Sequence, residues 1–519
     1  MLGFPAVLDS RFAESSLASP LFRTKSIDKL LADSQLPEHR LKKSLGPLSL
    51  TALGIGAIIG SGIFIVTGTA AAGETARYPS LLQAPLLSVL LHGPRAIGVM
   101  GRPGAGPAVA LSFLFVAIAC GLAGLCYAEL ASMIPIAGSA YTYTYATLGE
   151  LVAWIIGWDL ILEYAVSNMA VAVGFSAYID SLLSGFGLHL SSRWTTPTYS
   201  PATGWTGHYN LAGFVIVMLL TVLLVIGIRE SAGANTIMVA IKIAAILVFV
   251  YAGAHFIKPV NWKPFMPNGW QGVLTGGAIV FFTYIGFDSV STAAEECRNP
   301  SRDVPIGIMG SLAACAVLYV AVAVVLTGIQ KWNTLDNAAP VALALRAIHL
   351  PTVERWVTVG ALMGMISSIL VFQLGQARIW FAMSRDGLLP RAFSRVHRRF
   401  RTPAVSTWIA GLVVAIPAGI FDIGTLVDLS NIGTLFAFIL VTIAVLVLRK
   451  KQPGRKRGFR VPFAPWVPIL SLACCLVLMA SLTVENWIRF FVWLFIGLAI
   501  YFRYSRKHSQ LQPEAPAAE

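Results

Sequence analysis

Apolar runs of roughly 20 residues recur along this chain from Leu48 to Tyr501, and each is long enough to cross a bilayer as a helix. No soluble core needs so many such segments. Only 12% of the residues are charged, whereas a soluble domain has about a quarter. The chain is therefore predicted to be an all-α membrane protein with several spanning helices.

The apolar windows predict about twelve spans. They run near 47–72, 106–131, 141–180, 209–229, 233–256, 270–296, 304–329, 352–383, 404–421, 427–449, 462–483 and 485–503. Lys and Arg concentrate in the loops of one side, for example within 391–401 and 449–460. Cytosolic loops carry the excess of positive charge, so both termini are predicted to be cytosolic. The Lys and Arg residues that give the net charge of +14 thus cluster in loops, where they orient the protein in the membrane. No nucleic-acid partner is expected.

The first span contains the glycine-rich string GIGAIIGSGIF at 54–64. Several glycines at mid-membrane weaken a helix, which predicts a break at Gly60, Ser61 and Gly62. Free N–H groups at such a break, together with the positive end of the next half-helix, would receive an anion. The alternative is that Gly56 and Gly60 form a G-x-x-x-G spacing that serves close helix packing alone.

A second interrupted span favours the broken helix. The string FFTYIGFDS at 281–289 places Gly286 and Asp288 inside an apolar run. Paired interrupted helices in corresponding positions of two halves are typical of transporters built from inverted repeats. The N–H groups of the first break and the carbonyls of the second together predict a site for a zwitterion.

Five strings in order make the chain resemble the cationic amino acid transporter family of the amino acid–polyamine–organocation superfamily: GIGAIIGSGIF, SMIPIAGSAYTY, GWDLILEY, FFTYIGFDSVSTAAEE and FAMSRDGLLP. The resemblance runs from about Leu45 to the twelfth span and excludes residues 73–104. It implies a leucine-transporter-like fold with two inverted five-helix repeats and two further C-terminal helices. It also implies a substrate site whose members are Ile59, Gly60, Ser61, Gly62, Phe282, Thr283 and Ile285. In it, residues 60–62 would hold the substrate carboxylate, and carbonyls of 282, 283 and 285 its ammonium.

Of the ionisable residues within predicted spans, where charge is costly and usually functional, three are singled out: Lys242, Glu163 and Asp288. Lys242 is too deep in the fifth span to be an interface anchor, and the resembling family carries a lysine where sodium binds in sodium-coupled relatives. We predict that it couples transport to protons or acts as a fixed internal cation. The alternative is a structural lysine paired with a carbonyl. Glu163 and Asp288 are predicted to attract a basic substrate side chain, or else to pair with buried polar groups and freed backbone.

The predicted domains are a cytosolic N-terminal segment at 1–43, a transmembrane transporter domain at 44–504 and a cytosolic tail at 505–519. Residues 73–104 form an atypical insert, interrupted by Pro85 and Pro94. It is interpreted either as an external hairpin on the membrane surface or as a segment foreign to the fold. We expect the protein in the plasma or inner membrane of the cell.

The predicted function is secondary transport of amino acids, cationic or broad in range, driven by protons and independent of sodium. An exchanger or facilitator without proton coupling, an amino-acid sensor and a channel are the alternatives. A channel would need polar rings along a pore, and a sensor would need a sizeable soluble output domain. The expected partners are an amino acid, a proton and membrane lipid. Neither a cofactor nor a metal ion is expected, because no Cys/His group has metal-ligand spacing.

Overall fold

The computed structural model describes residues 21, 23–28, 45–75, 77–84, 88–89, 91, 101–136, 138–226, 232–397 and 402–510. Within these ranges, eight helices are long and apolar enough to cross a membrane. A bent pair forms a ninth span, and three shorter apolar helices bring the candidate spans to twelve. The predicted multi-pass, all-α fold class is confirmed.

The membrane-crossing helices are α2 (Pro47–Ile58) with α3 (Gly62–Ala72), α5 (Val109–Met133), α7 (Glu150–Ser184), α9 (Leu211–Ile226), α10 (Ala232–Ala254), α11 (Gly269–Val280), α13 (Pro300–Ile329), α15 (Pro351–Arg385), α16 (Ala404–Ile420), α17 (Ile423–Lys451), α18 (Trp466–Ala480) and α19 (Val484–Ile500). The shorter helices and turns are η3 (Gly106–Ala108), α6 (Ser139–Thr147), α8 (Ser192–Thr195), η4 (Pro259–Trp262), η5 (Phe281–Tyr284), α12 (Ser289–Thr292), η6 (Ala294–Glu296), η7 (Trp332–Thr334), α14 (Pro340–Ala347), η8 (Arg391–Ser394), η9 (Tyr501–Ser505) and α20 (Arg506–His508). Two small antiparallel pairs join β1 (Gly73–Glu74) to β2 (Arg102–Pro103) and β3 (Tyr199–Ser200) to β4 (Gly204–Trp205).

Local sequence explains where several helices begin. Proline occupies the first position of α2, α13, α14 and α15, where its missing N–H costs nothing and its fixed φ suits a helix. Asp422 caps α17, because its carboxylate accepts hydrogen bonds from the N–H groups of Gly424 and Thr425.

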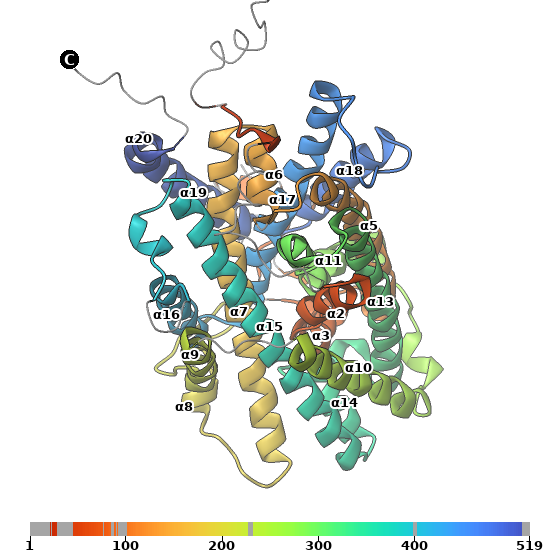
Figure 1. Ribbon diagram of the computed structural model, residues 1–519. Coiled ribbons are helices and arrows are strands. Elements are labelled where there is room, and N and C mark those ends of the chain that lie inside the picture. Colours follow the sequence, from red (N-terminus) through yellow and green to blue (C-terminus); the bar gives the residue numbers. More distant parts are fainter. Residues whose placement is uncertain are drawn as a thin grey trace, which may run out of the picture.

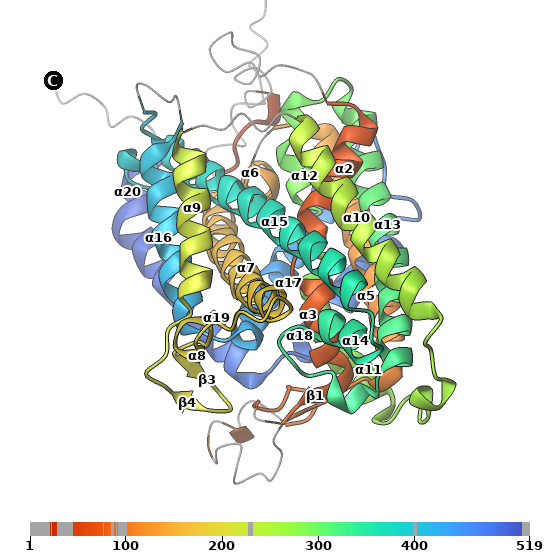
Figure 2. The same cartoon turned by 90° about the horizontal axis from the view of Figure 1, so that it is seen from below.

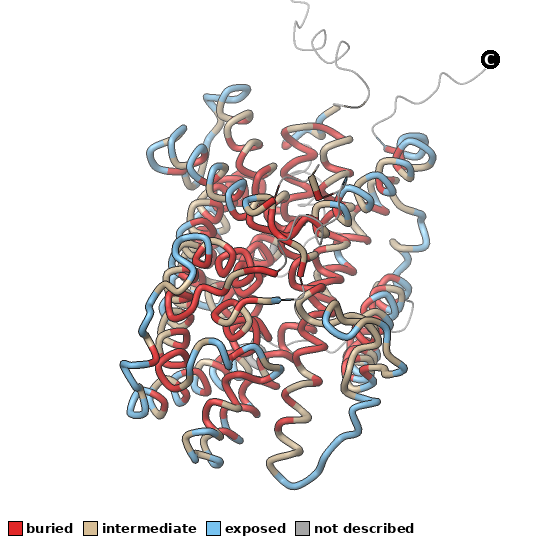
Figure 3. Tube along the Cα trace, turned by 180° about the vertical axis from the view of Figure 1, so that it is seen from behind, coloured by how far each residue is buried: buried red, intermediate tan, exposed pale blue. Residues whose placement is uncertain are grey.

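The helices form one bundle in which α7 and α15, each 35 residues long, pack along each other (Figure 1). α13 packs along both α5 and α2, and α10 packs against α15 (Figure 2). Buried residues concentrate along the inner faces of these helices, while exposed residues lie on the periphery and in the loops (Figure 3). The two predicted breaks therefore lie inside protein, where irregular backbone at membrane depth is tolerated.

Both predicted breaks are present. The α2–α3 pair is bent by 48°, and residues 59–61 separate its two halves. At the second break, the α-helix α11 ends at Val280. The chain then forms the 3₁₀ turn η5, and Ile285 after it is extended. Gly286 follows with φ of +114°, a conformation that favours glycine because it has no Cβ. The sequence thus located both breaks, although the first lies one residue earlier than predicted, because Gly62 already belongs to α3.

One predicted span was wrong in its extent. The apolar window at 141–180 is not one helix: α6 ends at Thr147, and α7 begins at Glu150. Gly149 between them has φ of +104°, which turns the chain and ends the helical path. The cause is local backbone geometry, which an apolar window does not detect.

Both described ends of the chain meet at Asp386, directly after α15. Lys25 Nζ lies 3.0 Å from Asp386 Oδ1, and the N–H of Gln510 donates to the Asp386 carbonyl at 3.2 Å. Tyr141 of α6 donates to Asp386 Oδ2 at 2.7 Å. Of the segments predicted at 1–43 and 505–519, only residues 21, 23–28 and 505–510 are described, so their boundaries and cytosolic placement stay predictions.

The described parts of the 73–104 insert are integrated into the bundle. Strands β1 and β2 pair, so the ends of the insert close on each other. Arg77 contacts Glu74 and lies 2.5 Å from Asp422, and Arg102 contacts Glu74 and lies 2.8 Å from Asp428. We call these five residues the arginine clamp, because they tie the end of α3 to the start of α17.

The described ends of the insert are thus bonded to the bundle, while its placement outside the membrane stays a prediction. The backbone of Pro79 also accepts a hydrogen bond from the N–H of Val484, at the start of α19. Pro85 and Pro94, which suggested the interrupted hairpin, lie outside the described residues.

The clamp predicts a pH-dependent contribution to stability. Burial raises the pKa of Glu74, but the charges of Arg102 and Arg77 outweigh burial and hold this pKa below its ordinary value. A lowered carboxyl pKa stabilises the fold above the unfolded-state pKa, and this stabilisation is lost as pH falls through the folded-state pKa. We expect Glu74→Gln to lower the free energy of unfolding at neutral pH by about 1–3 kcal/mol.

The difference in free energy of unfolding between wild type and Glu74→Gln should narrow as pH falls below about 4, where glutamate protonates even in the unfolded state. Melting temperatures of the detergent-solubilised protein across this range measure it. Asp28→Asn is the matched control, since its carboxylate pairs with Arg455 but is 82% exposed. A difference that stays constant with pH would contradict this role of Glu74.

Candidate functional site

The two helix breaks are in direct contact. A Cβ added to Gly62, at the start of α3, would lie 2.8 Å from Thr283 Cγ2 and 3.0 Å from Thr283 Cα. A Cβ on Gly286 would lie 3.0 Å from the backbone of Ala57 in α2. The structure therefore brings together the two predicted halves of the zwitterion site, and glycine is what permits the close approach.

The first break presents hydrogen-bond donors. The first N–H groups of α3 have no carbonyl within their own helix to bond. The residue that caps α3, Ser61, makes no capping bond with its side chain, and its buried Oγ has no partner among the described residues. The start of α3 also carries the positive end of its helix dipole. The donors at Ser61 and Gly62 fit a carboxylate, whereas the N–H of Gly60 donates to the Ile58 carbonyl at 3.0 Å.

Side chains of α13 and α15 donate hydrogen bonds to carbonyls of the breaks. Tyr319 of α13 lies between the breaks, and its hydroxyl is 3.1 Å from the Ile58 carbonyl and 2.9 Å from the Thr283 carbonyl. Ser368 of α15 donates to the Ile59 carbonyl at 3.3 Å. Sequence reasoning missed both residues, because a tyrosine or serine in an apolar span carries no mark of its partner.

Lys242 of α10 points into the first break. Its Nζ donates to the carbonyls of Gly56 at 2.6 Å and Ile59 at 3.0 Å, and the residue is fully buried. These carbonyls lie at the C-terminal end of α2, where the helix dipole is negative and favours a cation. Pairing with carbonyls is what the structural alternative predicted. The same geometry places the ammonium at the break itself, as the coupling role requires.

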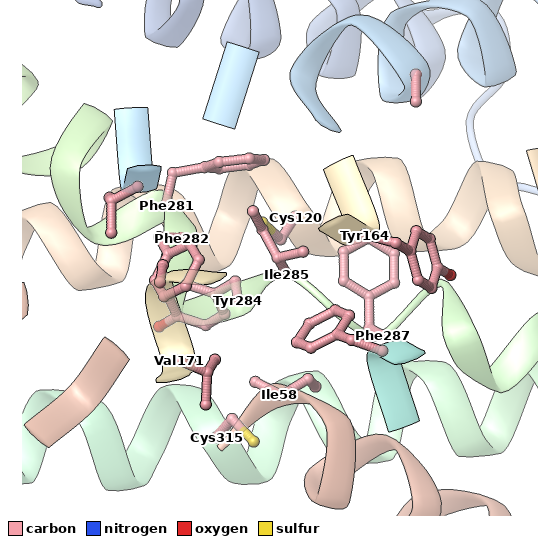
Figure 4. Packing of buried hydrophobic residues seen from close by; sticks show 14 of the residues in the cluster. Ile58, Cys120, Tyr164, Val171, Phe281, Phe282, Tyr284, Ile285, Phe287 and Cys315 are labelled. Carbon is pink, nitrogen blue, oxygen red and sulfur yellow. The ribbon is translucent and has the colours of Figure 1, made fainter. Parts of the chain in front are cut away.

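The carbonyls predicted to receive the substrate ammonium lie at the second break. The Phe282 carbonyl accepts from the N–H of Ile285 at 3.3 Å, and the Thr283 carbonyl accepts from Tyr319. Each carbonyl oxygen has two lone pairs, so both retain capacity for a second donor. Phe282, Ile285, Ile58 and Val171 belong to one cluster of buried hydrophobic residues around the breaks (Figure 4). The site is thus lined by apolar groups around a few polar ones.

Buried acids lie next to the second break. Asp288 accepts a hydrogen bond from the hydroxyl of Tyr164 in α7 at 2.9 Å. Glu163 precedes this tyrosine, and its buried Oε2 has no partner among the described residues. Asp159, one turn earlier, has both carboxylate oxygens buried and unpartnered within the same part of the chain. Sequence reasoning did not single out Asp159, although its intramembrane charge was visible.

Comparison with known proteins also indicates a transporter. The profile of the family described as amino acid permease matches residues 45–502. The chain belongs to the amino acid permease family. Its members are transporters, and the protein is therefore a membrane permease and not an enzyme.

Individual relatives of this permease differ in what they carry. It is 46% identical over 494 residues to the branched-chain amino acid permease BcaP of Bacillus subtilis, across 95% of this chain and 99% of the relative. It is 45% identical over 493 residues to the methylthioribose transporter of the same organism, with the same coverage. The vacuolar cationic amino acid transporter 2 of Arabidopsis thaliana is 37% identical over 444 residues, across 84% of this chain and 64% of its own length. The predicted resemblance is confirmed, while cationic specificity is not.

The contact between the breaks predicts a strong effect of Gly62→Ala. The new methyl group must displace Thr283, which would separate the breaks at a cost of about 1–3 kcal/mol. We expect uptake of labelled amino acid into proteoliposomes to fall at least about tenfold. Gly121→Ala in α5 is the control, because its Cβ would meet no atom within 4 Å. Equal uptake by the two variants would show that the close approach has no role.

Tyr319→Phe should loosen both breaks at once. The change removes the donor shared by the Ile58 and Thr283 carbonyls. The Ile58 carbonyl keeps the N–H of Gly60, but the buried Thr283 carbonyl loses its side-chain donor, at a cost of about 1–3 kcal/mol. We expect a lower melting temperature and a KM for transport raised several-fold. Tyr251→Phe, at a tyrosine that is 74% exposed on α10, controls for loss of a hydroxyl. An unchanged KM would contradict the bridging role.

Proposed function

We propose that this permease is a secondary active transporter of amino acids in the plasma membrane, broad in range, coupled to protons and independent of sodium. The observation that carries the proposal is the ammonium of Lys242 between the carbonyls of Gly56 and Ile59. Half-helix C-terminal ends and unwound carbonyls are where transporters of this architecture hold their coupling cation. A covalently fixed cation at this position supports transport that needs no sodium.

Lysine also supplies a way to couple to protons. Its amine can release a proton when held in an apolar setting, unlike a guanidinium, so its charge can change during the transport cycle. Loss of that charge would weaken the hydrogen bonds to the Gly56 and Ile59 carbonyls, because a neutral amine is a poorer donor than an ammonium. Proton release would thus be linked to the geometry of the residues that receive the substrate carboxylate.

The amino-acid backbone is proposed to bind across both breaks. The start of α3 and Ser61 offer donors to the carboxylate, and carbonyls at 282, 283 and 285 offer acceptors to the ammonium. For the side chain, the buried Oε2 of Glu163, which has no partner among the described residues, supports a basic substrate, since a buried carboxylate is costly without a cation. The relatives named for branched-chain substrates support neutral ones. A broad range that includes both is the proposal consistent with these observations.

The alternatives make different demands. An exchanger or facilitator would use the same site with Lys242 as a fixed cation only. A sensor would bind the amino acid without moving it, and a channel would need a continuous polar path. The bent, glycine-containing break supports a carrier, because it is a hinge within a packed bundle.

Uptake by purified protein in proteoliposomes tests the proposal directly. Labelled arginine, leucine and alanine are supplied with and without an inward pH gradient, in sodium-free buffer. We expect accumulation of neutral and basic substrates that rises with the gradient. Exchange without accumulation would support the exchanger, and binding without movement would support the sensor. Movement of none of the three would overturn transport of amino acids by this chain.

Lys242→Met tests the coupling role. Methionine keeps the length of the side chain and removes its charge, so the Gly56 and Ile59 carbonyls lose their donor. We expect gradient-driven accumulation to be abolished. The control is Lys331→Met, at an exposed lysine outside the spans. Unchanged dependence on the pH gradient in the Lys242 variant would rule out proton coupling through this residue.

A further inference from the structure

A buried asparagine on α7 has no partner in the structure. Asn168 is fully buried, and neither its Oδ1 nor its Nδ2 has a hydrogen-bond partner among the described residues. Leaving a buried amide unpaired costs roughly 1–3 kcal/mol per group. The adjacent Ser167 is satisfied, because its Oγ lies 2.6 Å from Ser430 Oγ of α17. The missing partners are therefore specific to Asn168 and not a general feature of this turn.

The position of Asn168 on α7 directs it toward the first break. Residues 164, 168 and 171 follow the i, i+4, i+7 spacing of one helix face. Tyr164 on this face bonds Asp288 of the second break. Val171 on the same face lies 3.6 Å from where a Cβ of Gly60 would be, and Figure 4 shows it beside Ile58. Asn168 lies between Tyr164 and Val171 on this helix face, and the spacing places it toward the junction of the two breaks.

The chemistry of a carboxamide defines what fits it. An asparagine offers an acceptor oxygen and two N–H donors, and carries no charge. A hydroxyl or amide on a ligand can both donate to and accept from such a group. An aliphatic group satisfies neither function, and a cation uses only the oxygen.

We propose that Asn168 is a specificity-determining residue that hydrogen-bonds a neutral polar group, a hydroxyl or an amide, on the substrate side chain. The inference rests on the proposed function and deepens it by naming a substrate class. Ser61 Oγ, likewise buried and unpartnered, remains for the substrate carboxylate. The two orphan groups thus have separate tasks on one ligand.

Threonine and valine provide the test, because they have nearly the same shape and differ by a hydroxyl in place of a methyl group. Uptake of each, labelled, is measured in proteoliposomes containing wild type or Asn168→Leu. Leucine has nearly the shape of asparagine without its polar atoms. We expect the threonine-to-valine ratio of kcat/KM to fall at least about tenfold in the variant, with valine transport retained. Asn168→Ser, which keeps a hydroxyl in a smaller side chain, should give an intermediate ratio.

The matched control is Asn486→Leu. Asn486, in α19, is equally buried and its amide atoms are equally unpartnered, but it is not on the α7 face that carries Tyr164 and Val171. A shift of the ratio by less than about twofold in Asn168→Leu, or an equal shift in Asn486→Leu, would overturn the proposal. So would a wild-type protein that moves valine and excludes threonine. If wild type moves no amino acid at all, the proposed function itself fails, and this outcome is distinguishable from the others.

Discussion

Backbone N–H and C=O groups freed at the two helix breaks need hydrogen-bond partners that water cannot supply inside the membrane. Side chains from several other helices of the bundle provide them. In lipid, an unpaired peptide group costs several kcal/mol, so a spanning helix breaks only where other groups take over its hydrogen bonds. Here Lys242 of α10, Tyr319 of α13 and Ser368 of α15 bond carbonyls of the first break. All three are more than 180 residues from their acceptors. The broken conformation is thus a product of tertiary packing, not of the glycines alone.

This dependence explains what sequence reasoning could and could not predict. Glycines in an apolar run and a lysine inside a span are visible because lipid makes both exceptional. The breaks at 59–61 and Gly286, and Lys242 itself, were found for that reason. Tyr319, Tyr164 and Ser368 were missed, since such residues are ordinary in spans and their partners include backbone carbonyls, which no residue type marks. The limits of α6 and α7 were missed because a single turn at Gly149 leaves the apolar window unchanged.

The groups left unsatisfied are as informative as those that are bonded. The carbonyls at the first break have donors, whereas Ser61 Oγ and both polar atoms of Asn168 have none among the described residues. Unpartnered buried atoms also occur elsewhere in the described residues, for example in Asn486, so it is the placement of Ser61 and Asn168 near the breaks that points to a ligand. Tyr319 and Ser368 belong to the scaffold. The orphan atoms are those that a ligand would complete.

The bundle is tied on both sides of this site. The arginine clamp joins the end of α3 to the start of α17, and Asp386 joins α6, the end of α15 and the described N-terminal residues. α16 spans between the two sides, so these contacts lie at opposite ends of the bundle. The clamp is buried, with the Arg102 and Asp428 side chains 1% and 3% exposed. At the Asp386 end, Glu129 of α5 pairs with Arg457, and their side chains are 2% and 4% exposed. Alternating access requires that one end opens while the other holds, so a buried ion pair must break at whichever end opens, and removing one partner from such a pair is costly.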